Sequence, residues 1–487
     1  MISKPMNKLI KRYKEISLPV KAGLWFTICN ILQRGISVLT VPIFTRLLSQ
    51  DQYGVYSLYL SWLNLLSIFT SLNLYYGVFN KAMVKYEDDR DRYISAMQGL
   101  VTVLCVAFFL VYLLFHEELN VFFELTTPVM CMMFLEMLMV PALQFWIGKK
   151  KFEYDYKPIV GVSLLKSVLN PLLGIVFVVI SEQKAQARIF AIVLLEVIIG
   201  GTLLIIQFLR GKSFFVKKYW TYSLKFNIPL IPHYLSGSIL NLGDRIIIQK
   251  MVGRTSVALY SVAYNVAMLT QLVTNAIVQA ITPWLYKSLK EKNYEGINQK
   301  IRPIMILVAG LSCVLMLLAP EIVWIFASKE YSSAVSVIPP IAASVFFIYM
   351  YNVYSNFEFY FEKKLFIVIA SVSAAVMNIV LNIVFVPLFG YVAAGYTTLF
   401  CYAVYAFSHF CFTKIICMKE IRGAKIFEFR DFLVCALIVV AFSFVSELLY
   451  LNTVVRYAAI ILIVLAGFIF GNRFIRTTKE IGIRKDR

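Results

Sequence analysis

The chain has 487 residues, of which 60% are hydrophobic and only 15% are charged. Soluble globular domains have roughly 45–50% apolar and about 25% charged residues, so the composition excludes an ordinary soluble protein and indicates a membrane protein. The formal net charge of +20 would suit a nucleic-acid partner, but the distribution of the cations along the chain argues against one.

Apolar runs recur from residue 22 almost to the C-terminus, and about 20 apolar residues suffice to cross a bilayer as a helix. We predict fourteen spans and an all-α polytopic membrane protein, because the sequence lacks the alternating pattern of β-barrel strands. The predicted spans are 22–46, 55–79, 94–115, 126–147, 158–180, 189–209, 228–250, 258–284, 303–326, 335–360, 365–386, 391–413, 431–450 and 455–473.

Lysine and arginine gather in alternate connections between these spans. Counted from the N-terminal tail, one set of connections holds 37 of the 47 basic residues, the other set holds 7, and 3 lie inside spans. The positive-inside rule therefore places both termini in the cytoplasm and removes the need for a nucleic-acid partner. The basic N-terminal segment MNKLIKRYKEI is expected to form an interfacial helix. No cleavable signal peptide is expected, because the first apolar run is long and contains Arg34.

Motifs for cofactors, metals and nucleotides are not found in the sequence. The eight cysteines include no CxxC pair, and the three histidines have no metal-ligand spacing. Gly211-Lys212-Ser213 resembles the end of a phosphate-binding loop, but Ile206 stands where that loop needs a glycine. All connections on the outer side are short, so we expect no cofactor, no metal and no external catalytic domain.

A weak internal repeat divides the chain into two halves. RLLSQDQYGVYSLY at 46–59 aligns with KMVGRTSVALYSVA at 250–263, and each segment runs from one predicted span into the next. Repeated halves often enclose the substrate site of a transporter. The predicted regions are a cytoplasmic N-terminal segment 1–21, a six-helix bundle 22–210, a cytoplasmic linker 211–227, a second six-helix bundle 228–416, two appended helices 417–474 and a cytoplasmic tail 475–487.

Three stretches carry a resemblance to a known family. PIFTRLLSQDQYGVYSL, GDRIIIQKMVG followed by ALYSVAY, and VPLFGYVAAGYTT resemble the lipid-linked oligosaccharide flippases of the multidrug/oligosaccharidyl-lipid/polysaccharide exporter superfamily. The resemblance is greatest to the bacterial O-antigen and capsule repeat-unit flippases of the Wzx type. It implies two pseudo-symmetric bundles around a central cavity that opens alternately to each side of the inner membrane. It also implies an undecaprenyl-pyrophosphate-linked glycan as substrate, and a polysaccharide polymerase with chain-length machinery as partners.

Four predicted spans have a polar face at helical spacing, which would be unfavourable against lipid and should line protein or water. The face residues are Thr27, Asn30, Arg34 and Ser37 in the first span, Ser57, Ser61, Asn64 and Ser71 in the second, Asn241, Arg245 and Gln249 in the seventh, and Tyr264, Gln271, Asn275 and Thr282 in the eighth.

Arginines in two of these faces are the strongest candidates for substrate binding. A midspan arginine costs about 2.5–3.5 kcal/mol, so Arg34 and Arg245 should not face lipid. Guanidinium groups bind pyrophosphate through bidentate hydrogen bonds, and we expect both arginines to project into one cavity. An internal salt bridge is the alternative, although the adjacent Asp244 is badly placed to pair with Arg245. The predicted substrate-binding set is Arg34, Arg245, Lys166, Asn30, Asn241, Tyr264, Gln271 and Asn275.

The intramembrane acids Glu136, Glu196 and Asp244 are candidates for ion coupling. Two structural alternatives stay open: Lys166 can neutralise Glu196, or it can pair with Glu136. Glu358 is expected to reach the lipid headgroups near the cytoplasmic end of its span.

Two other functions compete with the flippase. A cation-coupled drug or metabolite antiporter would use the buried carboxylates, but the cationic faces of the first and seventh spans argue against cationic cargo. An integral-membrane glycan polymerase, ligase or acyltransferase would need a large external loop or a set of catalytic histidines. The sequence offers only His409 within a span and His116 beside a short loop.

Overall fold

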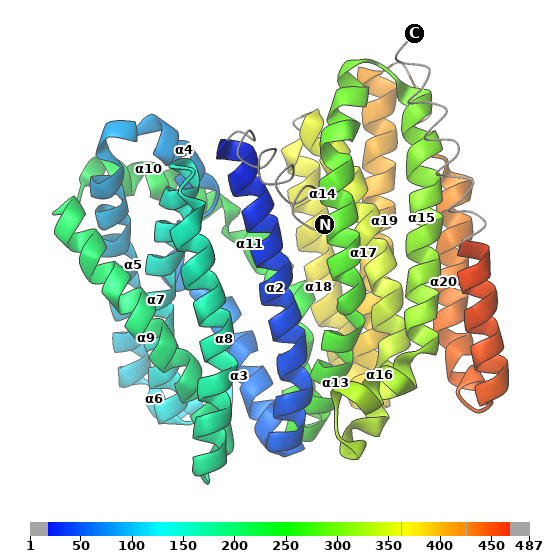
Figure 1. Cartoon of the computed structure of the whole chain (residues 1–487), viewed down its shortest axis with the longest axis horizontal. Coiled ribbons are helices and arrows are strands. Elements are labelled where there is room, and N and C mark those ends of the chain that lie inside the picture. Colours follow the sequence, from blue (N-terminus) through cyan, green and yellow to red (C-terminus); the bar gives the residue numbers. More distant parts are fainter. Residues whose placement is uncertain (1–17, 362, 422, 424–425, 468–487) are drawn as a thin grey trace, which may run out of the picture. The chain divides into compact units, whose positions relative to one another are not determined.

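The computed structural model of the chain describes residues 18–361, 363–421, 423 and 426–467. The predictions for an interfacial N-terminal helix and for the C-terminal tail lie outside these residues, as does the prediction for the side chain of Thr27. Every regular element of the described part is helical, which confirms the predicted all-α class. The chain divides into two compact units, Met1–Ile231 and Pro232–Arg487, here called unit 1 and unit 2. Figure 1 shows their helices coloured along the sequence.

Eleven helices of the described part are long and apolar enough to cross a membrane. Two of the fourteen predicted spans are missing from this set because of their local structure: 55–79 falls mostly in the more polar helix α3, and 228–250 is broken into four short helical segments. The predicted span 455–473 appears as a shorter apolar helix, Thr453–Gly467, beyond which the structure is not described.

Unit 1 begins with the helix α2 and ends with the short helix α10. Its helices are α2 (Leu18–Leu47), α3 (Gln50–Ser71), α4 (Gly77–Lys85), η1 (Glu87–Asp89), α5 (Arg90–Leu114), α6 (His116–Phe123), α7 (Thr127–Phe152), α8 (Tyr156–Ile180), α9 (Lys184–Gly211), α10 (Lys217–Asn227) and η2 (Ile228–Leu230). The start of α3 is fixed by a capping box, in which Ser49 and Gln52 satisfy each other's backbone N–H groups.

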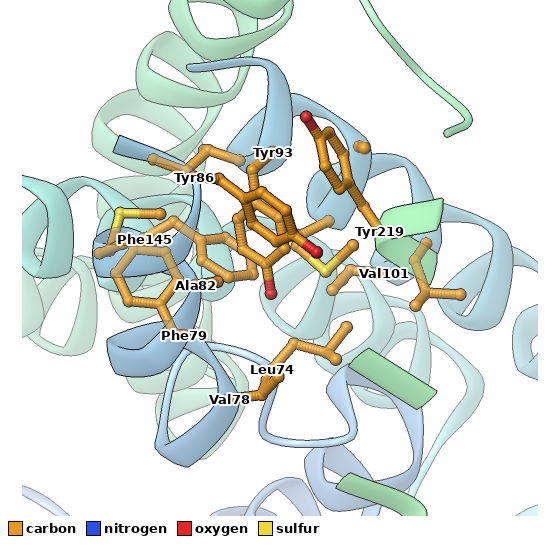
Figure 2. Close-up of a cluster of buried hydrophobic side chains, with 14 of the residues drawn as sticks. Leu74, Val78, Phe79, Ala82, Tyr86, Tyr93, Val101, Phe145 and Tyr219 are labelled. Atoms are coloured by element: carbon orange, nitrogen blue, oxygen red, sulfur yellow. The ribbon is translucent and has the colours of Figure 1, made fainter. Parts of the chain in front are cut away.

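The segment predicted as a linker between the bundles contains α10, which packs on α4 and α5 of unit 1 (Figure 1). Figure 2 shows the rings of Tyr86, Tyr93 and Tyr219 gathered in a buried cluster beside Phe79 and Phe145. The Tyr219 hydroxyl donates to an Asp89 carboxylate oxygen at 2.7 Å. Burial and this hydrogen bond raise the pKa of Tyr219 to about 12, so the hydroxyl keeps its proton at neutral pH. The segment is thus held to unit 1 by aromatic packing and a charge-assisted hydrogen bond.

Unit 2 contains the remaining helices. They are α11 (Ile231–Ser238), which starts at the last residue of unit 1, the π-helical η3 (Ile239–Gly243), α12 (Asp244–Met251), α13 (Arg254–Ala267), α14 (Leu269–Lys290), α15 (Tyr294–Leu317), α16 (Ala319–Phe326), η4 (Lys329–Val337), α17 (Ile338–Tyr360), α18 (Lys364–Phe389), α19 (Tyr391–Glu420) and α20 (Phe429–Leu449). The π-helical turn directly precedes Asp244, and such turns frequently occur at functional sites.

The two segments of the internal repeat have equivalent local structure, each within its own unit. Ser49 is the N-cap of α3, and Gly253, its counterpart at a shift of 204 residues, is the N-cap of α13. Gly253 has φ +116°, a backbone angle that favours glycine, so a serine would be strained there. The repeated sequence therefore starts a helix at matching positions, although the two helix starts use different capping chemistry.

Helices α17 and α19 form the core of unit 2 and pack together over much of their length. All side chains of α17 from Ile338 to Met350 are buried. Because α17 is apolar all round, it can be surrounded by other helices, as expected of a central helix. Gly390, with φ +72°, separates α18 from α19 and allows the two helices to form an antiparallel pair.

Candidate functional site

A cavity of about 540 Å³ lies inside unit 1, between helices α2, α3, α7, α8 and α9. Asn30 and Ser37 of the predicted face line it from α2, together with Gln33 and Thr40. The cavity also receives cations and amides from the other helices, including Gln144, Lys151, Lys166, Asn170 and Arg188. A polar cavity among apolar helices is the kind of place where a membrane protein keeps a hydrophilic ligand.

Arg188 on α9 is the most buried cation of this cavity, with 4% of its surface exposed. Its Nη2 donates to the side-chain oxygen of Asn170 at 2.8 Å, and its guanidinium lies 4.2 Å from the ring centre of Phe44 and 5.3 Å from that of Tyr56. Its Nε has no hydrogen-bond partner within the described part of the chain. The guanidinium is thus held in place by α3 and α8 and by Phe44 of α2, and keeps unused hydrogen-bonding capacity.

Lys166 lines the same cavity and forms an ion pair with Glu196 of α9. The sequence left open whether Lys166 pairs with Glu196 or with Glu136, and the structure contains the pair with Glu196. The second carboxylate oxygen of Glu196 has no hydrogen-bond partner among the described residues. Glu136 instead accepts a hydrogen bond of 2.5 Å from the Tyr59 hydroxyl. It also interacts electrostatically with Glu196, Lys166 and Arg188. Unit 1 therefore holds a cluster of two acids and two cations, in which all but Lys166 are buried.

A second polar network surrounds Asp244 in unit 2. The Asp244 side chain has no exposed surface and accepts hydrogen bonds from the Tyr260 hydroxyl at 2.5 Å, Asn382 Nδ2 at 2.6 Å and the Thr398 hydroxyl at 2.8 Å. Asn382 in turn accepts from Thr397 at 2.5 Å. These contacts join α12, α13, α18 and α19, and they satisfy a carboxylate that would otherwise be costly to bury.

Arg245 makes its own hydrogen bonds within unit 2. Its Nε donates to the Ser261 hydroxyl at 3.0 Å and its Nη1 to the Asn241 carbonyl at 2.9 Å. Its guanidinium also lies 4.6 Å from the ring centre of Tyr264, whose hydroxyl donates to the side-chain oxygen of Asn241 at 3.1 Å. The structure thus brings together three residues of the predicted substrate-binding set: Asn241, Arg245 and Tyr264.

The remaining predicted residues differ in their surroundings. Arg34 on α2 is exposed, has no hydrogen bond or ion pair to any described residue, and does not line the cavity of unit 1. Asn30 is also exposed, but lines that cavity. Gln271 and Asn275 on α14 are half-buried. The prediction that Arg34 and Arg245 share one cavity stays a prediction, since the two residues belong to different units.

Sequence reasoning missed Arg188, because the predicted span began one residue after it. Hydropathy windows end at charged residues, whereas α9 begins at Lys184 and carries Arg188 two helical turns before Glu196. The steps of four from Arg188 to Ile192 and from Ile192 to Glu196 were the available signal.

The prediction that Glu358 reaches the lipid headgroups was wrong. Glu358 does not reach the headgroup region, because its side chain is fully buried against His409 of α19. No group of three or more His, Cys, Asp or Glu side chains that could hold a metal occurs in the described part of the chain.

Eleven apolar spans in two helical units, with a polar cavity inside one unit, define a polytopic membrane transport protein. A family model described as "Polysaccharide biosynthesis protein" matches residues 20–289, and the chain belongs to that family. A second model, MatE, matches residues 229–384.

Curated relatives support the same assignment. The chain is 24% identical over 383 residues to Lsg locus putative protein 1 of Haemophilus influenzae, covering 74% of this chain and 89% of the relative. It is 22% identical over 401 residues to the probable low-salt glycan biosynthesis flippase Agl15 of Haloferax volcanii, covering 80% of this chain and 82% of the relative.

Solved structures share the fold. The lipid II flippase MurJ in an inward closed conformation has a TM-score of 0.67 at 14% identity, over 93% of this chain and 99% of that structure. An inward-facing multidrug resistance transporter of the MATE family has a TM-score of 0.65 at 15% identity, over 80% of this chain and 96% of that structure. The chain thus combines membership of a polysaccharide biosynthesis family with a fold that a lipid II flippase and a multidrug transporter share.

Proposed function

We propose that the chain moves an undecaprenyl-pyrophosphate-linked oligosaccharide repeat unit from the cytoplasmic to the outer leaflet of the bacterial cytoplasmic membrane. Transport proceeds by alternating access and supplies the assembly of a surface polysaccharide, either O-antigen or capsule. The polymerase and the chain-length machinery that would use the product are proposed partners. The relative named as a glycan biosynthesis flippase supports this substrate class.

The observation that carries the proposal is the cavity of unit 1, which combines the buried Arg188 and the more exposed Lys151 and Lys166 with amides and hydroxyls. Pyrophosphate has several acceptor oxygens and at least two negative charges, and a guanidinium such as Arg188 forms strong charge-assisted hydrogen bonds with such a group. The side chains of Asn30, Gln33 and Asn170 suit sugar hydroxyls. The prenyl tail needs no polar contact and can stay in the lipid. We include Arg34, Arg245, Lys166, Asn241, Tyr264, Gln271 and Asn275 in the proposed substrate-binding set.

Reconstituted vesicles test the proposed function. The probe is the lipid-linked glycan pool extracted from cells lacking this gene, labelled on the glycan with a dithionite-sensitive fluorophore. Dithionite quenches only the outer leaflet, so transport appears as an increased quenched fraction relative to empty vesicles. Vesicles with Arg188→Ala protein should lose most of the increase. An unchanged quenched fraction with folded wild-type protein would exclude the proposed substrate, and accumulation of a cationic dye instead would favour the antiporter.

The orientation with both termini cytoplasmic is part of the proposal. Accessible tags at both termini and within the predicted loop 181–188 should be labelled in intact cells only in that loop, of which residues 181–183 connect α8 and α9 and the rest begin α9. Labelling of the N-terminal tag with protection of the 181–188 tag would reverse the orientation.

The buried acids Glu136, Glu196 and Asp244 are the proposed ion-coupling groups of the flippase. Each lies among hydrogen-bond donors or cations, so its charge can respond to a change in those contacts. Normal transport by all three single amide variants, Glu136→Gln, Glu196→Gln and Asp244→Asn, with and without an ion gradient, would remove them from the mechanism.

A further inference from the structure

Glu358 of α17 and His409 of α19 form a buried acid–imidazole pair inside unit 2. Nδ1 of His409 lies 2.9 Å from both carboxylate oxygens of Glu358. Neither side chain has any exposed surface. The pair therefore links the two central helices of unit 2 at a point that water does not reach in this conformation.

Aromatic rings surround the imidazole on several sides. Tyr405 lies edge-on at 4.7 Å between ring centres, with Tyr351 at 5.9 Å and Phe412 at 6.5 Å. Nε2 of His409 has no hydrogen-bond partner among the described residues. Only one imidazole nitrogen is thus bonded within the described residues. The surrounding rings carry no formal charge, so the net charge near the imidazole is that of Glu358 and His409.

No other charged group balances the pair within the described residues. The titratable groups in contact with the imidazole are the tyrosines Tyr351 and Tyr405. The charged groups whose side chains the structure describes on the helices packed against α17 and α19 make other contacts or are exposed. Asp244 and Arg245 are as described above, Lys363 pairs with Glu420, Arg302 pairs with Asp431, and Lys300 lies against the Trp284 ring. The exposed groups are Lys250, Arg254, Lys287, Lys290, Glu295, Lys329, Glu330, Lys414, Lys419, Arg430 and Glu447.

The net charge of the Glu358–His409 pair depends on the number of protons that it holds. A carboxylate with a neutral imidazole carries one negative charge, whereas the same pair with one further proton is neutral, wherever that proton lies. A net charge is disfavoured in dry surroundings, so the full burial of both side chains favours the neutral pair. A conformation in which α17 and α19 separate and water enters would let the proton leave. Proton binding and conformation are then thermodynamically linked.

We propose that Glu358 and His409 form a proton-binding site that links a transmembrane proton gradient to the conformational cycle of the flippase. This inference rests on the proposed function, because the cycle it drives is that of glycan transport. The site is separate from Glu136, Glu196 and Asp244, since it alone pairs a carboxylate with an imidazole, and histidine is the residue type whose ordinary pKa, about 6.5, lies closest to physiological pH.

The competing explanation is that the pair only fastens α17 to α19. Glu358→Gln separates the two explanations, because an amide oxygen still accepts a hydrogen bond from Nδ1 but cannot take up a proton. His409→Asn keeps an amide near the position of Nδ1 and also cannot titrate. His233→Asn is the matched control, because His233 in the same unit is bonded to the Ser371 hydroxyl at 3.2 Å and not to a carboxylate.

The experiment uses full-length protein in vesicles with the labelled lipid-linked glycan pool and a trapped pH dye, with and without a gradient of one pH unit. One proton exchanged per cycle lets that gradient support up to about a tenfold ratio of glycan between leaflets. Wild type and His233→Asn should respond to the gradient and move protons with glycan. Glu358→Gln and His409→Asn should move glycan without responding.

The outcomes separate the two proposals. Wild-type vesicles that move no glycan would contradict the proposed function. Glycan transport by wild type without any response to the gradient, or an unchanged response in folded Glu358→Gln, would overturn the proton site. Should both variants fail to fold, substrate-linked proton uptake by wild type is compared with the swapped pair, Glu358→His with His409→Glu. A swapped pair that folds and transports but takes up no proton would also overturn the site.

Discussion

The guanidinium of Arg188 lies 5.3 Å from the ring of Tyr56, and the guanidinium of Arg245 lies 5.8 Å from the ring of Tyr260. Tyr56 and Tyr260 are equivalent residues of the internal repeat, 204 positions apart. Each unit therefore places a buried arginine against the same tyrosine of its repeated helix. The arginines themselves come from non-equivalent helices, α9 and α12, so the repeat fixes the aromatic partner but not the cation.

Arg188 is expected to matter both for folding of unit 1 and for transport. Arg188→Ala removes the hydrogen bond to Asn170 and the contact with Phe44, and losing a charge-assisted hydrogen bond costs about 1.5–3 kcal/mol. Arg188→Lys keeps the charge but loses the planar fork, so it should retain partial transport. Thermal unfolding in detergent and vesicle transport measure the two effects. The control is Arg210→Ala on the same helix, where the arginine is exposed. Wild-type transport by Arg188→Ala would show that the cavity binds substrate without this residue.

The Lys166–Glu196 ion pair should show an asymmetry between its partners. Glu196 is 5% exposed and Lys166 is 24% exposed, so removing the cation leaves the more buried charge alone. Breaking a buried pair by removing one partner costs about 3–5 kcal/mol, and the partial exposure of Lys166 should reduce this figure.

We therefore expect Lys166→Ala to unfold at a lower temperature than Glu196→Gln. The double variant Lys166→Ala with Glu196→Gln should recover part of the loss, as a double-mutant cycle would measure. Equal destabilisation by the two single variants, with additive effects in the double variant, would show that the pair contributes little to stability.

Sequence patterns predicted the apolar spans, the repeat and several polar faces, because each depends on residues close together in the chain. The hydrogen bonds that Asn382 and Thr398 donate to Asp244 could not be predicted from the sequence, since those residues lie on helices more than 100 residues away along the chain. Arg188 was missed for a different reason: hydropathy treats any cation at the end of an apolar run as a boundary. Glu358 was misplaced because lysines near it suggested the membrane surface, whereas its partner was a distant histidine.

Two adjacent glycines of α9 allow a sharp test of helix packing in unit 1. A Cβ atom at Gly200 would lie 2.5 Å from the Met139 carbonyl oxygen, whereas one at Gly201 would lie 3.6 Å from the Met139 sulfur. The first distance is a clash with backbone, and the second is an ordinary contact. Gly200→Ala should therefore separate α7 from α9 and destabilise the protein by about 1–3 kcal/mol.

Gly201→Ala is the matched control, and the gain in helix propensity of about 0.5–1 kcal/mol should leave it as stable as wild type or slightly more stable. The measurement is the unfolding temperature of each variant in the same detergent. If the two alanine variants unfold together, α7 and α9 do not approach as closely as described.

Arg34 and Arg245 are predicted to differ in what their removal does, although both are proposed to bind the pyrophosphate. Arg34 is exposed and has no partner among the described residues, so Arg34→Ala should fold normally and lose transport alone. Arg245 is buried and donates to Ser261 and Asn241, so Arg245→Ala should lower the unfolding temperature as well.

Loss of one charge-assisted contact to the substrate corresponds to about 1.5–3 kcal/mol, roughly tenfold or more in affinity. Arg34→Lys and Arg245→Lys keep the charge without the fork and should support intermediate transport. Surface glycan in cells at low expression, normalised to protein abundance in the membrane, ranks the variants. Because Arg34 has no hydrogen bond or ion pair to a described residue, its removal tests substrate binding most directly. If a well-inserted Arg34→Ala protein supports wild-type surface glycan, Arg34 is not needed for substrate binding, and transport does not explain why this helix carries a cation.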